Sequence, residues 1–332
     1  MLKSLAILLI ISFAVISLTS DLRAAEIKID EWQVPYPNSR PRDPYVHPDG
    51  RVWFCGQAGG YLAWFDPINV LFGKVNLDDG AKPHNLIIDA DGDIWFAANS
   101  LPYIGRLDPE TGEIKRYVMP QETARDPHTL VFDGVGNIWF TLQQGNAVGR
   151  LNMGSGKIDL IDMPVSGARP YGIKVDREGR PWVALFGTHS LATIDPETLD
   201  LDLIELPRFE ARPRRLEITT DGSIWYADYA GGFIGRYRPS DGSFDEWALP
   251  GGESSRPYGT ALDDQDILWI AMGGNPNRLV GFDTNEKKFT PITQIPNARG
   301  SIRHMFYHRP AQQIWLGEDT NFIARIRLKP AK

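Results

Sequence analysis

Cysteine is almost absent from this chain of 332 residues, which contains only Cys55. A single cysteine cannot form an internal disulfide, so packing and hydrogen bonds must hold the fold. Clustered positive charge is absent as well, since the formal net charge is −7 and there is no basic tract. Nucleic acid is therefore excluded as an expected partner, because binding it requires lysines and arginines that displace counterions.

Several motifs of catalysis and cofactor binding are missing too. The sequence has no glycine-rich phosphate loop, no serine in a nucleophile elbow and no cysteines at zinc-binding spacing. Any chemistry must therefore come from other polar side chains.

The N-terminus has the features of a processing segment. A short positive region, MLK, precedes the apolar run SLAILLIISFAVISL, and TSDLRAA then ends in small residues. This order predicts a signal peptide over residues 1–25, followed by a single domain over residues 26–332. We expect a periplasmic or secreted protein without a membrane partner after cleavage; an uncleaved anchor is the alternative, although the apolar run is short for a span.

A repeat of about 43 residues dominates the remaining sequence. Its seven copies share an apolar run, a turn and a tryptophan, and six of them also share a proline, as in KPHNLIIDADGDIWF and RPRRLEITTDGSIWY. Short β patterns at this period predict the blades of a propeller. The repeated tryptophans are Trp53, Trp95, Trp139, Trp182, Trp225, Trp269 and Trp315.

The two ends of the chain complement each other. The seventh repeat stops after its third strand, FIARIRL, whereas IKIDEWQVP near the N-terminus matches the fourth strand SFDEWALP of the fifth repeat. We therefore predict an all-β, seven-bladed propeller whose last blade is completed by the N-terminal strand, which leaves no open sheet edge. A monomer is expected.

Polar residues recur 11 positions before each tryptophan, where the innermost strand of a blade begins. Seven such positions would form a ring around one mouth of the central channel and could hold a small-molecule ligand. They are Arg42, His84, His128, Tyr171, Arg214, Tyr258 and His304.

A second polar offset lies three residues after the tryptophan, where Asp228 and Glu318 stand. Residues equidistant from a hairpin turn face each other, so we expect Arg214 beside Asp228 and His304 beside Glu318. The second pair is the sharper chemical candidate, because a carboxylate can orient an imidazole for acid–base work. Alternatively, Glu318 could hold Mg²⁺ or Ca²⁺, or the two residues could form a structural salt bridge.

The repeated unit, in which PHNLIIDADGDIWFAAN leads into IGRLDPETGEIKRYVMP, resembles the streptogramin B lyase (virginiamycin B lyase) family over nearly the whole mature chain. That resemblance implies a lyase that opens a lactone by elimination, with His304 as the base and Glu318 on a Mg²⁺ ion. Two positions depart from the family pattern: Ile302 replaces an acidic residue and Tyr258 replaces a histidine.

Two other functions remain open at this point. The first is a propeller that binds a ligand without chemistry. The second is a lactone hydrolase of the gluconolactonase type, whose metal would need several oxygen ligands near the axis; only Glu318, Asp228 and Asn99 are obvious candidates. A metal site at His84 and His128 with Asp126 is a further, weaker hypothesis.

Overall fold

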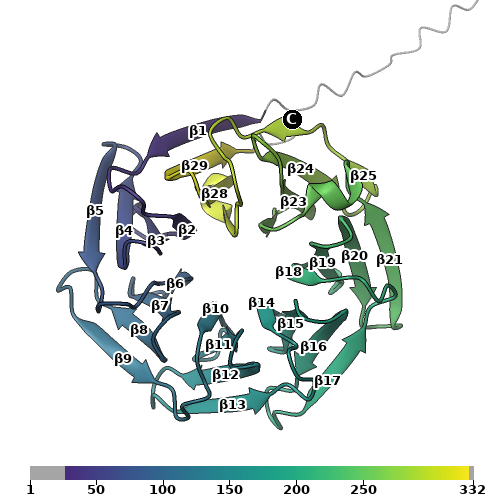
Figure 1. Ribbon diagram of the computed structural model, residues 1–332, viewed down its shortest axis with the longest axis horizontal. Coiled ribbons are helices and arrows are strands. Elements are labelled where there is room, and N and C mark those ends of the chain that lie inside the picture. Colours follow the sequence, from purple (N-terminus) through teal and green to yellow (C-terminus); the bar gives the residue numbers. More distant parts are fainter. Residues whose placement is uncertain (1–26, 329–332) are drawn as a thin grey trace, which may run out of the picture.

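Seven antiparallel sheets surround a common axis in the computed structural model, which describes residues 27–328 (Figure 1). Each sheet is one blade, and its first strand lies nearest the axis. The predicted seven-bladed propeller is therefore confirmed. The predicted signal peptide over residues 1–25 lies outside the described residues.

The blades follow the order of the repeats. Blade 1 consists of β2 (Pro41–Val46), β3 (Val52–Gly56), β4 (Tyr61–Asp66) and β5 (Leu71–Asn76). Blade 2 consists of β6 (Leu86–Ile88), β7 (Ile94–Ala98), β8 (Tyr103–Leu107) and β9 (Ile114–Val118). Blade 3 consists of β10 (Pro127–Phe132), β11 (Asn137–Leu142), β12 (Ala147–Asn152) and β13 (Ile158–Asp162). Blades 4 and 5 consist of β14 (Pro170–Val175), β15 (Pro181–Leu185), β16 (Ser190–Ile194) and β17 (Leu201–Glu205); and β18 (Pro213–Ile218), β19 (Ile224–Asp228), β20 (Phe233–Arg238) and β21 (Ser243–Ala248).

The last two blades are less regular. Blade 6 has two short outer strands that both pair with its third strand, and blade 7 draws its fourth strand from the N-terminus. Their strands are β22 (Thr260–Leu262), β23 (Ile267–Met272), β24 (Arg278–Asp283), β25 (Lys288–Phe289) and β26 (Thr293–Gln294) in blade 6, and β27 (Met305–His308), β28 (Gln313–Glu318), β29 (Phe322–Arg327) and β1 (Lys28–Gln33) in blade 7. Two 3₁₀ helices, η1 (Gly252–Ser255) and η2 (Arg309–Ala311), lie in connections.

The N-terminal strand closes the ring, as predicted. β1 pairs antiparallel with β29 from Lys28 opposite Arg327 to Gln33 opposite Phe322. Trp32 stacks on Trp315 with a centroid separation of 5.8 Å and lies 4.9 Å from the ring of Phe65 in blade 1. The closing strand therefore joins two blades through aromatic packing as well as through its ladder.

The repeated turn and the repeated tryptophan are physically linked. In blade 2, one carboxylate oxygen of Asp89 accepts the backbone N–H groups of Asp91 and Asp93 in the turn, and the other accepts the indole N–H of Trp95 at 2.8 Å. Aspartates at the same place bind the indoles of Trp139, Trp182 and Trp269. The motif thus fixes a buried aromatic ring and a hairpin at once.

The hairpin of blade 7 differs from the others by one residue. In the other six blades the residue opposite the tryptophan stands eight positions before it, as Glu217 stands before Trp225. In blade 7 the residue opposite Trp315 is Phe306, nine positions before it. The longer turn contains η2, and it moves every residue of β27 by one position relative to the repeat.

No helix among residues 27–328 is long and apolar enough to cross a membrane.

Substituting Trp32→Ala tests the closure. Loss of its contacts with Trp315 and Phe65 is expected to reduce the free energy of unfolding by about 3 kcal/mol, as for large-to-small changes in packed aromatic sites. Urea denaturation followed by tryptophan fluorescence measures the change. Phe209→Ala, at a side chain that is 70% exposed, is the control and should be nearly neutral; equal stability of the two variants would contradict the role of β1.

Candidate functional site

The first strands of the blades direct a ring of polar side chains at the axis. Its members are Arg42, His84, His128, Tyr171, Arg214, Tyr258 and, in blade 7, Arg303, and we call them the upper ring. Five of them, Arg42, His84, His128, Tyr171 and Tyr258, are each at most 5% exposed. The predicted ring therefore exists, but its side chains pack against one another and close the channel instead of lining an open mouth.

The two histidines of the upper ring are stacked. The rings of His84 and His128 lie 3.5 Å apart between centroids, and Tyr171 follows at 4.1 Å from His128. Burial lowers the pKa of both histidines well below the usual range, and nearby arginines, Arg42 and Arg215 among them, lower it further. Both imidazoles are therefore neutral at physiological pH.

The hypothesis of a metal site at these histidines finds no support in the described part of the chain. Asp126 bonds the side chain of Asn99 and the backbone N–H of Gln144 rather than facing an imidazole. The side chain of Asn99, which follows β7 of blade 2, therefore bonds the segment at the start of blade 3. Residues 27–328 contain no group of three or more His, Cys, Asp or Glu residues placed to hold a metal ion.

Arg214 lies among four aromatic rings. Its guanidinium carbon is 3.5 Å from the ring centroid of Tyr258 and within 4.8 Å of those of Tyr171, Phe186 and Tyr229. It also donates a hydrogen bond of 2.8 Å to the hydroxyl of Tyr258, which in turn bonds the hydroxyl of Tyr171.

Tyr258 is consequently an unusually acidic phenol. Burial alone would raise its pKa, but the charges of Arg214, Arg42, Arg215 and Arg303 outweigh burial and lower the pKa below 10. The lowered pKa makes the phenolate of Tyr258 more accessible than that of an ordinary tyrosine.

A lower layer of polar side chains lies beneath the upper ring. Arg215 reaches across the axis from blade 5: it donates to Thr129 in blade 3 at 3.2 Å and to the carbonyl of Arg303 in blade 7 at 3.1 Å. Its Nη2 also lies 3.5 Å from the buried carboxylate of Asp43 in blade 1. Asp43 further accepts from Arg42 and Asn85, so the lower layer joins blades on opposite sides of the channel.

His304 belongs to this lower layer, which corrects its predicted place in the ring. Because the hairpin of blade 7 is one residue longer, Arg303 takes the upper position, 5.8 Å from the ring of Tyr258, and donates to Asp319. Burial lowers the pKa of His304 to about 3 against the opposing effect of Asp43. His304 is a neutral imidazole facing the channel.

The predicted pairing of His304 with Glu318 is wrong for the same reason. Within the described residues, no hydrogen bond or ion pair joins them. The charges that act on His304 come from Asp43, Arg215, Lys174 and Arg42, whereas those that act on Glu318 come from Glu31 and Arg299.

The predicted pairing of Arg214 with Asp228 is wrong as well. The strand register places Pro213, not Arg214, opposite Asp228. The buried carboxylate of Asp228 instead accepts from Arg208 at 2.6 Å and from the backbone of Arg212 at 2.8 Å. Arg208 comes from the loop that joins blades 4 and 5, and it also bonds Glu246 on the outer strand.

Blade 7 repeats this arrangement without the arginine. Glu318 and Glu31 correspond to Asp228 and Glu246, but Asn297 binds Glu31 in place of a guanidinium. Oε1 of the fully buried Glu318 has no hydrogen-bond partner among residues 27–328, while Oε2 accepts from Thr320. Burial and the neighbouring Glu31 raise the pKa of Glu318 to about 8.

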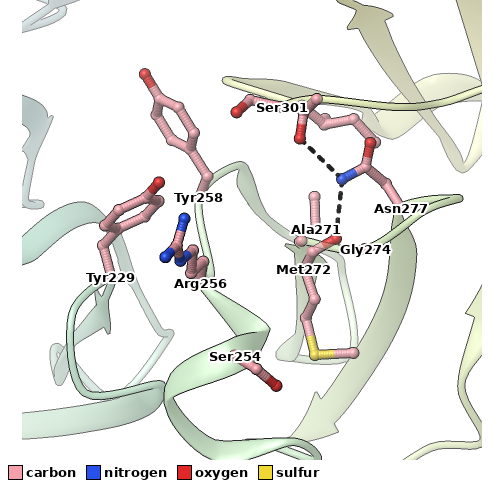
Figure 2. Close-up of a pocket in the computed structure, with 12 residues that line it drawn as sticks. Tyr229, Ser254, Arg256, Tyr258, Ala271, Met272, Gly274, Asn277 and Ser301 are labelled. Atoms are coloured by element: carbon pink, nitrogen blue, oxygen red, sulfur yellow. Dashed lines mark hydrogen bonds between the residues drawn. The ribbon is translucent and has the colours of Figure 1, made fainter.

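Two cavities flank the closed axis. One of about 340 Å³ opens on the face where the inner strands begin, which we call the loop face, and is bounded by Tyr229, Arg256, Tyr258, Asn277 and Ser301. Figure 2 shows Arg256 between Tyr229 and Tyr258, with the hydroxyl of Tyr258 directed away from Asn277. The amide of Asn277 donates to the carbonyls of Met272 and Gly300 and braces the opposite wall.

The other cavity, of about 380 Å³, lies in the central channel and includes Arg215, Lys174, Glu217 and His304. Its walls follow the inner strands away from their starts, toward the hairpin turns, on what we call the turn face. His304 and the loop-face cavity therefore lie on different sides of the upper ring.

Several residues of these sites were missed by the sequence reasoning. Because the hairpin of blade 7 is longer, Arg303 stands 12 positions before its tryptophan instead of 11. Arg215 and Asp43 stand 10 positions before theirs, one position after the predicted ring. A signal for the latter two was present, because the position ten residues before the tryptophan is charged in only these two repeats. Arg256 lies outside the strands of the repeat, whereas Glu31 stands where the matching strand SFDEWALP has Glu246, a correspondence that gave a signal for it.

Comparison with known proteins shows the family of the chain. The profile of the virginiamycin B lyase family matches residues 22–279. The chain belongs to the virginiamycin B lyase family. No curated protein sequence matches it.

Solved structures share the fold at low identity. The virginiamycin B lyase of Staphylococcus aureus is 23% identical, with 92% of this chain and 100% of that chain covered at a TM-score of 0.83. A streptogramin B lyase structure is 24% identical, with 91% and 98% covered at a TM-score of 0.82. An extracellular domain of a putative two-component system from B. thetaiotaomicron is 17% identical, with 90% and 42% covered at a TM-score of 0.67.

The carboxyl pair of Glu318 and Glu31 predicts a pH dependence of stability in metal-free buffer. The pKa of Glu318 rises from about 4.5 to about 8 on folding, so the protonated carboxyl stabilises the fold fully below pH 4.5, and this contribution is lost as the pH rises through 8. The variant Glu318→Gln stays neutral. Wild type should therefore lose on the order of 3 kcal/mol between pH 5 and 8 relative to this variant.

Urea unfolding in the presence of EDTA at each pH measures the difference. Glu286→Gln changes a glutamate side chain that is 66% exposed and should follow wild type at every pH. Parallel curves for wild type and Glu318→Gln would show that Glu318 does not titrate in this range.

Proposed function

We propose that this protein is an exported lyase that opens a lactone or another cyclic ester by elimination in the loop-face cavity. Membership of the virginiamycin B lyase family supports the reaction class. The observation that carries the proposal is the position of Tyr258, which borders that cavity and accepts a hydrogen bond of 2.8 Å from the guanidinium of Arg214.

The proton acceptor in this proposal is the phenolate of Tyr258. It takes the proton from the carbon next to the ester-bearing carbon, a double bond forms between these two carbons, and the bond to the ester oxygen breaks. The carboxylate leaves without addition of water. Arg256, an exposed cation on the same wall, can bind the departing carboxylate through a charge-assisted hydrogen bond.

Glu318 and Glu31 would hold the divalent cation. Two adjacent carboxylates, one with an unpartnered buried oxygen, suit a hard cation such as Mg²⁺ or Ca²⁺. The corresponding carboxylates of blade 5 bind Arg208, whereas the pair in blade 7 has no guanidinium bonded to it among residues 27–328. When bound, the cation would supply Lewis-acid polarisation of an ester carbonyl.

His304 is the sequence-based candidate for the base. It borders the channel cavity, and neither Glu318 nor Glu31 borders that cavity. We therefore assign the proton transfer to Tyr258 and treat His304 as the alternative that the experiment must test.

The variant Tyr258→Phe removes the proposed base and retains the ring. Incubation with quinupristin, the compound in a structure of the inactive S. aureus enzyme, should give an opened ring of unchanged mass. We expect Tyr258→Phe to lower kcat/KM at least about 100-fold, the usual contribution of a general base. His304→Gln and the matched control Tyr229→Phe should retain activity.

Each other outcome identifies a different function. Loss of activity in His304→Gln but not in Tyr258→Phe would return the base role to His304. A product heavier by one water would indicate a hydrolase. Saturable binding without ring opening would indicate a propeller that only binds its ligand.

Thermal melts test the cation separately. Mg²⁺ at about 100 times its Kd should stabilise wild type by about 2.7 kcal/mol relative to EDTA. Glu318→Gln and Glu31→Gln should lose the shift, whereas Glu286→Gln should keep it. An unchanged melting temperature for wild type with both Mg²⁺ and Ca²⁺ would contradict the cation site.

A further inference from the structure

The central channel contains a second enclosed space with no part in the proposed reaction. The cavity of about 380 Å³ is closed toward the loop face by the lower layer and the upper ring. It lies within the size range of small-molecule sites. Its closed end and its walls differ in chemistry.

The closed end of the channel has an excess of positive charge. Arg42 and Arg215 are both at most 4% exposed, and the buried carboxylate between them is Asp43. Nη2 of each arginine is buried without a hydrogen-bond partner in the part of the chain that the structure describes, although Nη2 of Arg215 lies 3.5 Å from the carboxylate of Asp43. Of the two arginines, Arg215 borders the cavity. A buried guanidinium nitrogen without a partner is costly, so this end of the channel favours an anion.

His304 adds a neutral hydrogen-bonding group at the same end. It borders the cavity together with Arg215, and its Nδ1 is also buried without a partner among residues 27–328. A neutral imidazole can donate from Nδ1 in one of its tautomers. Arg215 and His304 thus offer both a charged and an uncharged donor to one acceptor group.

The walls farther from the closed end are mainly apolar. Leu86, Leu130 and Ile173 border the cavity, and Tyr45 and Phe306 form an aromatic pair with a centroid distance of 4.0 Å near the turn face. The one carboxylate on the wall, Glu217, is paired with Lys174 at 2.8 Å and accepts from Thr260. The wall is therefore suited to an uncharged body and does not offer a free acidic group.

We propose that the channel is a binding site for a small carboxylic acid with an apolar or aromatic body. The carboxylate binds Arg215 and the Nδ1–H of His304 at the closed end. The body lies along the apolar wall toward Tyr45 and Phe306. Inorganic phosphate lacks the apolar body and binds more weakly. This site is on the other side of the upper ring from the loop-face cavity and does not depend on the proposed lyase activity.

Titration calorimetry with 3-phenylpropionate tests the proposal on the whole mature protein. Binding should be saturable below about 10 mM, and the matched uncharged compound, 3-phenylpropionamide, should bind at least about tenfold more weakly, because the charge-assisted bonds are lost. Equal binding of the acid and the amide, or no binding of the acid, would overturn the proposal.

Variants assign the binding to the channel. Arg215→Gln should weaken binding of 3-phenylpropionate at least about tenfold, and His304→Leu should weaken it several-fold. Lys174→Glu adds a negative charge to the wall and should also weaken binding. The control Lys115→Glu makes the same change on the exposed outer strand β9 and should bind as wild type does.

Thermal melts show whether each variant is folded. Arg215 joins three blades, and if Arg215→Gln does not fold, the wall variant Lys174→Glu and the variant His304→Leu decide the question. Binding that is unchanged in both folded variants would place the ligand elsewhere and overturn the proposal.

Discussion

In four of the seven blades, a hydrogen bond joins an aspartate in the first hairpin turn to the indole of the repeated tryptophan and so fixes the turn and the buried ring together. In blade 2 the same carboxylate that holds the turn through Asp91 and Asp93 also satisfies Trp95. A buried indole N–H is costly without a partner; Trp225 bonds Thr219 instead of an aspartate, and Nε1 of Trp53 has no partner among residues 27–328. In those four blades the turn and the packed ring support each other, and the inner strands that end at these turns direct the axial side chains.

The fold could be predicted because this interaction leaves a regular trace in the sequence. The spacing of Trp53, Trp95 and their counterparts defines seven blades, and the match between the N-terminal strand and the fourth strand of blade 5 predicts the closure. The upper ring followed from the same count in six blades. The count of positions failed in the seventh blade, because the longer turn around η2 places Arg303 rather than His304 in the ring.

The candidate sites were less predictable, because their partners come from segments that do not repeat. Asp228 is neutralised by Arg208 from an interblade loop, and Glu318 lies beside Glu31 from the opposite end of the chain. No offset within a repeat marks Arg208, whereas Glu31 is marked only by the match of the N-terminal strand to the fourth strand of blade 5. Counting positions could identify which side chains begin or end a strand, but only the packing of loops on the blades determines which charges meet.

Arg215 crosses the channel axis and contributes to the field that acidifies Tyr258. The two faces of the propeller consequently share one set of positive charges. Negative charge that accumulates beside Arg215 on the turn face weakens the stabilisation of a phenolate on the loop face. The arginines at the axis therefore couple the loop-face cavity and the channel cavity electrostatically.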